Sequence, residues 1–442
     1  MARNKSRVVP FIILIITLGL LSGGAYLLYK DTDAPQITIT PDNGFITFTT
    51  PIAVNINDAE SGLKAVKIVL TQGKKKTTLK EQTLPKGTFD YNQEIIIKKK
   101  QIKQGDFEIA VWAVDSSLAG FGSGNAIIAR GNYTLDTIAP KITVQTSTHN
   151  LTQGGCALIL YTLDETPMKT GVKSGDDFFP GYKQPNGEYA CLFAMPFYSD
   201  VKTFNPVLVA EDAAKNKRTS TFWYHTNAKK YKHDNINISD RFLSTKMPQF
   251  ESSFPGVTNP VDLFLKVNRE LRVTNRAELR KLGLDTSPTF LFEKKFLRLP
   301  NSASRASFGD RRTYLHNGKK IDNQTHLGID LASTRHAPIP AANKGRIILA
   351  AQDFGIYGNA VIIDHGLGLQ TLYSHLSQID VAVGDVVDSG QIIGKTGATG
   401  MAGGDHLHYG VICSGIPVNP YEWWDETWIK NNITSKMDQP SD

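Results

Sequence analysis

The stretch Gly403-Gly-Asp-His-Leu-His-Tyr-Gly-Val-Ile412 places two histidines beside a run of β-branched residues. Val411 and Ile412 favour a β-strand. In a strand, residues i and i+2 point to the same face, whereas in a helix they diverge by roughly 200°. The stretch therefore predicts a strand that presents His406 and His408 on one side.

Two further pieces of this kind lie upstream in the same glycine-rich region. His326-Leu-Gly-Ile-Asp330 places a histidine and a carboxylate at i and i+4, on one face of a predicted strand, with Gly328 leaving room above the backbone. Leu372-Tyr-Ser-His-Leu-Ser377 adds His375. Two histidines and one carboxylate suit a catalytic zinc site with an open position for water, and further histidines can carry protons or stabilise an oxyanion.

With these pieces in this order, residues 300–425 resemble lysostaphin-type (LytM-like) zinc metallopeptidases, which hydrolyse peptide bonds in peptidoglycan. Six further segments carry the resemblance: Phe308-Gly-Asp-Arg, Gly355-Ile-Tyr-Gly-Asn359, Ile363-Asp-His-Gly366, Gly384-Asp-Val-Val, Gly390-Gln-Ile-Ile-Gly394 and Val418-Asn-Pro420. The fold that the resemblance implies is a small, partly open antiparallel β-barrel with an active-site groove.

The resemblance also implies a role for each residue of the site. His326, Asp330 and His408 are expected to bind one Zn²⁺ ion, and His375 and His406 are expected to be the catalytic histidines. Zinc-bound water then attacks the scissile carbonyl, and the two catalytic histidines stabilise the transition state, with their individual roles left open.

Other residues of this region receive structural expectations. His365 is expected to stabilise its turn, and the same type of role is favoured for His316 and His336 over lining the groove. Arg311 and Arg312 either contact substrate carboxylates or lie on the surface. Trp423 and Trp424 are expected to pack the end of the domain.

The amino terminus carries an uncharged run, Val8–Tyr29, behind three basic residues: Arg3, Lys5 and Arg7. As a helix this run is roughly 33 Å long, enough to cross a hydrocarbon core. Basic residues stay on the cytoplasmic side, so the rest of the chain is expected outside, periplasmic or facing the wall. An uncleaved single-pass anchor is favoured over a cleaved signal peptide, whose apolar region is usually shorter.

A repeat follows the apolar run. Asp31-Thr-Asp-Ala-Pro-Gln-Ile-Thr-Ile recurs 105 residues later as Asp136-Thr-Ile-Ala-Pro-Lys-Ile-Thr-Val. Each copy precedes alternating strands that end in an acidic turn, at Asp115 and at Asp212. This period fits β-sandwich domains and resembles bacterial immunoglobulin-like modules. The modules either act as a spacer or bind wall polymer or a cell-wall protein partner.

The second module contains Cys156 and Cys191, which either form a disulfide in an exported chain or remain buried free thiols. Cys413 is expected to be a buried apolar residue. The region 226–300 is expected to contain a helical hairpin. Its first helix starts at Asn259-Pro260, and its second has a capping box of Asn275 and Glu278 and ends at Gly283. This hairpin either packs on the next domain or covers the groove.

Composition sets the limits of this interpretation. The 442 residues include 40% hydrophobic and 21% charged residues, which excludes collagen, a fully disordered chain and a polytopic membrane protein. Three cysteines are too few for a disulfide-built scaffold. The net charge of +7 is mild, and we expect no nucleic-acid partner.

The sequence as a whole predicts a mainly β, membrane-anchored zinc metalloendopeptidase that hydrolyses peptide cross-links of peptidoglycan. The alternative is a non-enzymatic scaffold or activator of another cell-wall hydrolase. The predicted parts are a cytoplasmic stub and transmembrane anchor (1–30), β-sandwich modules (31–135 and 136–225), a helical connector (226–300), the LytM-like peptidase domain (301–428) and a polar tail (429–442).

Overall fold

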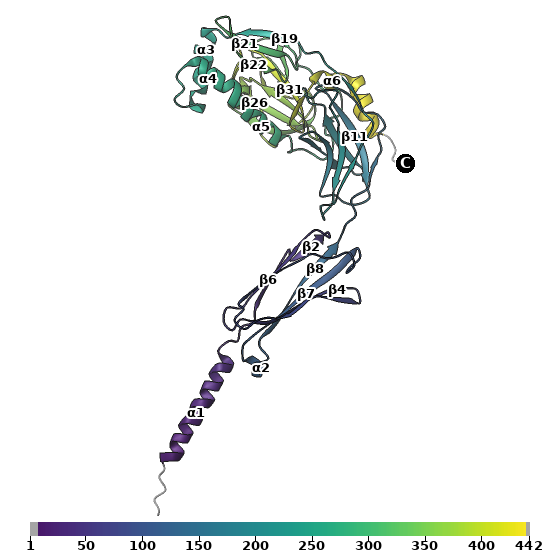
Figure 1. The fold of residues 1–442 in the computed structure, drawn as a ribbon. Coiled ribbons are helices and arrows are strands. Elements are labelled where there is room, and N and C mark those ends of the chain that lie inside the picture. The colour runs from purple at the N-terminus through teal and green to yellow at the C-terminus, as the bar shows by residue number, and fades with distance from the viewer. Residues whose placement is uncertain (1–7, 439–442) are drawn as a thin grey trace, which may run out of the picture. The chain divides into compact units, whose positions relative to one another are not determined.

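The computed structural model describes residues 8–438, and it confirms the mainly β class. The chain divides into two units, one of residues 1–139 with 213–216 and the other of residues 140–212 with 217–442 (Figure 1). The basic residues Arg3, Lys5 and Arg7 lie outside the described residues.

The first unit begins with helix α1 (Val8–Tyr29), which has the bounds of the apolar run. Its segment Val9–Tyr26 has a mean hydropathy of 2.0, and none of it is buried. Because the helix exposes apolar side chains on all sides, no polar face is left that water would solvate. The helix is therefore long and apolar enough to cross a membrane.

Two sheets and the short helix α2 (Ala119–Gly122) follow in the first unit (Figure 1), and the sheets enclose one apolar core. The smaller sheet has the strand order β1 (Gln36–Thr40), β3 (Ile52–Asn57), β6 (Asp90–Ile95). The larger has the order β2 (Asn43–Ile46), β8 (Ala126–Leu135), β7 (Gly105–Asp115), β4 (Leu63–Gln72), β5 (Lys75–Thr83). Alternate residues of β7 enter the core, as the two-residue period of a strand requires: Phe107, Ile109, Val111 and Ala113.

The second module has two sheets as well, each of four strands, and a separate parallel pair of β10 (Asn150–Thr152) and β18 (His225–Asn227). One sheet has the order β14 (Tyr182–Lys183), β15 (Tyr189–Ala194), β11 (Cys156–Leu163), β9 (Ile142–Val144). The other has the order β13 (Asp177–Pro180), β12 (Lys169–Ser174), β16 (Val207–Glu211), β17 (Lys217–Ser220). Both β modules are therefore two-sheet structures, and their immunoglobulin-like character stays a prediction.

The three cysteines are buried free thiols, which decides between the two alternatives for Cys156 and Cys191. These two lie on neighbouring strands but out of register, with Cys156 opposite Ala194 and Cys191 opposite Ile159. Cys413 is buried as expected, and its thiol lies 3.4 Å from the carbonyl oxygen of Leu192 in the second module.

The second module packs directly on the region of the late histidines. One continuous apolar core includes Leu158 and Phe193 of the module and Tyr373 and Val411 of the downstream sheet. This module is thus part of the body that carries the predicted site rather than a detached spacer.

The predicted helical hairpin is wrong, because residues 260–282 form one uninterrupted helix. It consists of α4 (Pro260–Lys266), the π-helical turn η2 (Val267–Leu271) and α5 (Arg272–Leu282). Asn275 is no cap, since its side-chain oxygen accepts a hydrogen bond from the backbone N–H of Ile356, at 3.0 Å. The Asn275 side chain, which suggested a helix start, is therefore engaged in a contact with a distant part of the chain. Before this helix lie α3 (Asp240–Lys246) and the 3₁₀ helix η1 (Met247–Ser253).

An eight-stranded antiparallel sheet carries the late histidines (Figure 1). Its order is β20 (Ala303–Ala306), β23 (Ile329–Ala332), β31 (Leu407–Cys413), β27 (Leu369–Ser374), β26 (Ala360–Asp364), β25 (Gly345–Ala351), β29 (Val386–Val387), with β32 (Ile416–Val418) beside β31. Two three-stranded sheets flank it: β24 (Pro338–Pro340), β30 (Ile392–Lys395), β28 (Gln378–Ile379), and β19 (His233–Asn237), β21 (Arg311–His316), β22 (Lys319–Thr325).

The segment predicted as a polar tail is helical as far as Met437 and packs on the second module. Residues 426–437 form a continuous helical segment: α7 (Glu426–Ile429), the π-helical turn η4 (Lys430–Thr434) and α8 (Ser435–Met437). Ile433 is fully buried, and the Lys436 ammonium donates a hydrogen bond to the carbonyl oxygen of Leu158, at 2.9 Å. The few apolar residues of the segment share one helical face, which the polar composition conceals.

Helix α6 (Pro420–Trp424) brings a carboxylate into the contact with the second module. Glu422 accepts a hydrogen bond from the backbone N–H of Cys156, at 3.2 Å. Burial raises the pKa of Glu422 to about 8, against the opposing effects of this hydrogen bond and of Lys229. The folded protein therefore holds a proton on Glu422 between about pH 5 and 8 that the unfolded chain releases.

Replacing Glu422 by glutamine should stabilise the protein increasingly as the pH rises. At pH 5 the folded protein contains a neutral side chain at position 422 whether it is glutamic acid or glutamine. At pH 8 the wild type must either bury the Glu422 carboxylate or take up a proton on folding, and both lower its stability. Urea unfolding at both pH values should show a gain of a few kcal/mol for Glu422→Gln at pH 8 relative to pH 5. Glu426→Gln, at an exposed position in the next turn, is the control; equal effects of the two variants would contradict the assignment.

Candidate metal centre and active-site groove

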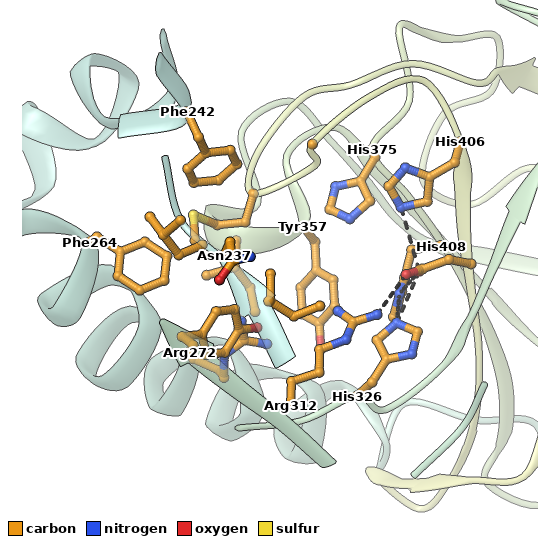
Figure 2. Close-up of a pocket in the computed structure, with 17 residues that line it drawn as sticks. Asn237, Phe242, Phe264, Arg272, Arg312, His326, Tyr357, His375, His406 and His408 are labelled. Carbon is orange, nitrogen blue, oxygen red and sulfur yellow. Dashed lines mark hydrogen bonds and ion pairs between the residues drawn. The ribbon is translucent and has the colours of Figure 1, made fainter. Parts of the chain in front are cut away.

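Three of the predicted residues, Asp330, His326 and His408, meet at one point beside the large sheet. Figure 2 shows the two histidine rings side by side. Asp330 Oδ1 lies 3.0 Å from His326 Nε2 and 2.9 Å from His408 Nδ1, and the two nitrogens lie 2.9 Å from each other. All three side chains are at most 14% exposed. The structure thus brings together the donor atoms of all three residues predicted to bind metal.

The backbone explains how they meet. Asp330 lies on β23 and His408 on β31, in direct register across the antiparallel pair. His326 was expected on the same strand as Asp330, and this is wrong: it lies in the turn before β23. The turn is possible because Gly328 has no side chain, since a Cβ there would lie 2.5 Å from His408 Nε2.

Backbone carbonyls fix the ring orientation of three histidines. The Nδ1 atoms of His326, His375 and His406 donate to the carbonyl oxygens of Ser307 (3.0 Å), Thr399 (2.9 Å) and Gly404 (2.8 Å), respectively. A carbonyl only accepts, so Nδ1 carries the proton and the Nε2 lone pair is free in the neutral ring. This arrangement is typical of histidines that bind a metal or exchange a proton.

His375 and His406 lie beside the three-residue cluster (Figure 2). Their ring centroids are 5.0 Å apart, and His406 Nε2 lies 3.5 Å from Asp330 Oδ1. His406 precedes β31 and pairs with Gly397 in an isolated bridge, so the predicted common face of His406 and His408 holds although only His408 lies on the strand. His375 follows β27 with a φ of +67°, a conformation that non-glycine residues adopt rarely.

Burial and neighbouring charges shift the pKa values of these groups in different directions. Burial raises the pKa of Asp330, but the charge interaction with His326 and the polar contacts with His326, His406 and His408 outweigh it and keep that pKa well below the usual value. Burial lowers the pKa of His408 to about 4 and, together with the neighbouring histidines, lowers that of His375 well below normal. The pKa of His406 is raised, since its contacts with Asp330 outweigh its burial.

A groove of about 350 Å³ opens in front of the cluster. One wall consists of the histidines on and beside the eight-stranded sheet, together with Tyr357. The opposite wall comes from the region predicted as connector, through Asn237 of β19, Phe242 of α3, Phe264 of α4 and Arg272 of α5 (Figure 2). The helical region therefore lines the groove as well as packing on the domain, and the idea that it covers the groove stays a prediction.

Arg312 on β21 completes the surroundings of the carboxylate. Its Nη2 donates to Asp330 Oδ2 at 2.9 Å, which leaves Oδ1 to the histidines. Arg311, the other arginine considered, is exposed and does not line this groove. Arg312 thus orients the carboxylate that faces both histidines.

Replacing Arg312 by glutamine should weaken metal binding by about 10- to 100-fold, the usual effect of removing a partner that orients a ligand. Competition with a chromogenic zinc chelator measures the affinity directly. Arg311→Gln removes the same charge one residue away and should bind zinc as the wild type does. An Arg312→Gln protein with unchanged affinity would show that the ion pair does not position Asp330.

The chemistry of the three residues fits a zinc ion. Two imidazole nitrogens and one carboxylate oxygen are a common zinc ligand set, and they converge beside an open groove. Two nitrogen lone pairs and an ionised carboxylate at these distances repel one another unless a proton or a cation lies between them.

The remaining histidines of this region have structural positions. His365 is fully buried, donates from Nδ1 to the Lys344 carbonyl (2.7 Å) and contacts Thr371 Oγ1 through Nε2 (2.8 Å). His316 donates to the Ile238 carbonyl at 2.9 Å. Neither these two nor His336 line the groove. Trp423 is fully buried, as expected of a residue that packs the end of the domain.

Comparison with known proteins agrees with this geometry. Residues 324–420 match the family model described as Peptidase family M23. This part of the chain is a LytM-type peptidase M23 domain. It includes all five histidine and aspartate residues of the site, whereas Arg312 and the helical wall lie before it.

Two curated relatives are similar to this M23 domain. DD-carboxypeptidase/endopeptidase Mpg of Neisseria meningitidis serogroup B is 45% identical over 95 residues, 22% of each chain. Peptidoglycan DD-endopeptidase ShyA of Vibrio cholerae is 40% identical over 94 residues, 21% of this chain and 22% of the relative. The match thus spans about a fifth of the length of these relatives.

Among solved structures, the catalytic domain of lysostaphin from Staphylococcus simulans is 28% identical, with 28% of this chain and 94% of that chain covered and a TM-score of 0.25. The M23 assignment rests on the family match and the sequence relatives.

Sequence reasoning missed the residues that complete the groove. Tyr357 lies inside a quoted segment, Gly355–Asn359, but nothing in its spacing indicated a groove residue. Phe264 and Arg272 come from a helix more than 50 residues before the first metal-site histidine, and only the tertiary structure brings them opposite it. The helical pattern that starts at Pro260 was the available signal. It predicted the helix but not which part of the chain the helix would face.

Proposed function

We propose that this chain is a zinc-dependent endopeptidase that hydrolyses peptide cross-links of peptidoglycan. The observation that carries the proposal is the convergence of Asp330, His326 and His408 within 3.0 Å, beside two further histidines in an open groove. The M23 domain and relatives named as peptidoglycan endopeptidases support a cell-wall substrate.

In this proposal, one set of residues holds the metal ion and another residue positions that set. His326, Asp330 and His408 hold the zinc ion, and Arg312 orients the carboxylate. When bound, zinc supplies a Lewis acid for a carbonyl oxygen and makes a water molecule nucleophilic near neutral pH. The groove beside them admits an extended peptide.

His375 and His406 act on the reacting groups. Their Nδ1 protons are held by backbone carbonyls, so Nε2 of each ring is the atom available for exchange. From there a protonated ring can donate to the oxyanion that develops on the scissile carbonyl, and a neutral ring can take the proton of the attacking water. Which histidine does which is left to the variants.

The proposal includes the location of the enzyme. Helix α1 remains as a single membrane anchor, and the residues after it lie outside the cytoplasmic membrane, where peptidoglycan is found. The length and apolar surface of α1 support this. N-terminal sequencing of the membrane-bound protein should find α1 still attached; a mature protein that starts after Lys30 would contradict the anchor.

Digestion of purified sacculi tests the substrate. The full chain, loaded with zinc in detergent, should release muropeptides whose peptide cross-links are cut, as seen by mass spectrometry. The His406→Ala protein should release far less while it retains the ion. Release that requires a second wall hydrolase, and is equal for wild type and His406→Ala, would favour the scaffold alternative instead.

A further inference from the structure

The first unit contains a buried cluster of three aspartates, far along the chain from the peptidase site. Asp31 lies between α1 and β1, Asp58 directly follows β3, and Asp115 is the last residue of β7. Each offers a carboxylate oxygen, and these oxygens all lie within 4.8 Å of one another. The residues are 6%, 5% and 0% exposed, respectively.

The hydrogen-bond partners of these carboxylates in the described part of the chain are neutral. Backbone N–H groups of Ser61 and Gly62 bind Asp58 Oδ1, at 3.0 and 2.6 Å. Asp115 accepts from the backbone of Ser117 and from Asn125. Burying three carboxylates together without a cation is strongly unfavourable, because their mutual repulsion adds to the loss of hydration.

One oxygen of the cluster has no hydrogen-bond partner among the described residues. Asp31 Oδ1 accepts from the backbone N–H of Asp33 at 3.2 Å, whereas Asp31 Oδ2 is buried and unsatisfied. Buried polar atoms almost always have a partner, so an orphaned carboxylate oxygen inside an acidic cluster indicates a group missing from the protein itself.

The side-chain amide of Asn125 is surrounded by more acceptor oxygens than it can donate to. Four oxygens lie within 3.3 Å of its nitrogen: Asp31 O (3.3 Å), Asp33 O (3.2 Å), Asp115 Oδ2 (2.8 Å) and Ser117 Oγ (3.1 Å). An amide has only two N–H donors. This pocket therefore holds more oxygen acceptors, carboxylate and carbonyl, than the protein has protons to offer them.

We propose that Asp31, Asp58 and Asp115 bind one calcium ion. Carboxylate and carbonyl oxygens, with no nitrogen or sulfur ligand, are the donors that Ca²⁺ prefers, and it accepts irregular geometry. Mg²⁺ requires a near-ideal octahedron and retains several waters, which a buried cluster drawn from three separate segments does not suit. The site is distinct from the zinc ligands in position and in chemistry.

The ion has a structural role at the start of the module. Asp31 is the second residue after α1, and the other two aspartates belong to the sandwich. Calcium therefore ties the segment that leaves the helix to the ends of β3 and β7. Without it, the three carboxylates repel one another and the segment around Lys30 loses its attachment.

Calcium binding to the zinc-loaded full chain in detergent tests the proposal. Isothermal titration should give one calcium ion per chain, with a Kd of about 10⁻⁴–10⁻³ M as in extracellular modules. A saturating concentration should raise the Tm by about 5 °C relative to EGTA, with less effect from Mg²⁺. Trypsin cleavage after the exposed Lys30 should slow in calcium.

The Asp115→Asn variant should lose calcium binding, the Tm shift and the protection of Lys30 together. Asp106→Asn, an exposed position on the same strand, should retain all three. Since asparagine keeps the size of the side chain, circular dichroism can verify the fold, and Asp58→Asn repeats the test at a second ligand. A wild-type chain with no saturable calcium binding, equal stabilisation by Mg²⁺, or unaltered binding by folded Asp115→Asn would overturn the proposal.

Discussion

A His326→Ala protein is expected to lose bound zinc and peptidase activity together. His326 supplies one of three converging donor atoms, and with two ligands left the ion is no longer held. Because a catalytic metal contributes several kcal/mol to transition-state stabilisation, activity should fall at least ~10³-fold. Elemental analysis of the purified protein and a cross-link cleavage assay measure the two losses.

His336→Ala is the matched control for this variant. His336 lies in the turn between β23 and β24, its side chain is 49% exposed, and it does not line the groove. It should keep one zinc ion and wild-type activity. A folded His326→Ala protein that still binds zinc stoichiometrically and cleaves its substrate would remove His326 from the metal site.

Replacing His375 or His406 by alanine is expected to separate activity from metal binding. Each variant should keep the zinc ion, since the three ligands are intact, but lose about 10²–10⁴-fold in kcat, the usual contribution of a positioned acid, base or oxyanion donor. Zinc content and kcat measured on one preparation test this directly.

The pH profiles of the two variants assign the roles. Loss of the basic limb of the profile marks the residue that acts as an acid, and loss of the acidic limb marks the base. If either variant loses zinc along with activity, that histidine is a ligand and the division of roles proposed above is wrong.

The two halves of the central site were predictable from local patterns, and the family resemblance joined His408 to His326 and Asp330. His406 and His408 are two residues apart, and His326 and Asp330 are four residues apart. In each pair both side chains face the site, although the histidine that comes first lies just outside the strand. His326 shows this: it lies in a turn rather than on β23, yet its Nε2 lies 3.0 Å from Asp330. Residues four positions apart can thus meet as predicted even where the predicted strand boundary is wrong.

The features that failed depend on distant parts of the chain. Asn275 has the spacing of a capping box, but the backbone of Ile356 binds its side chain and the helix continues. Ile433 lies in a segment of polar composition, and its burial depends on the presence of β11 beside it. The helical wall of the groove and the cluster of Asp31, Asp58 and Asp115 also join segments tens of residues apart, and no local pattern indicated either of them.

The most direct test of the account uses one defined substrate, a peptide-cross-linked muropeptide dimer, in heavy-oxygen water. The zinc-loaded full chain should convert it to two monomers, with one heavy oxygen atom in the newly formed carboxyl group, and His326→Ala should leave it intact. A dimer that stays uncut by protein carrying one zinc ion per chain would contradict the claim that this site is a peptidoglycan endopeptidase.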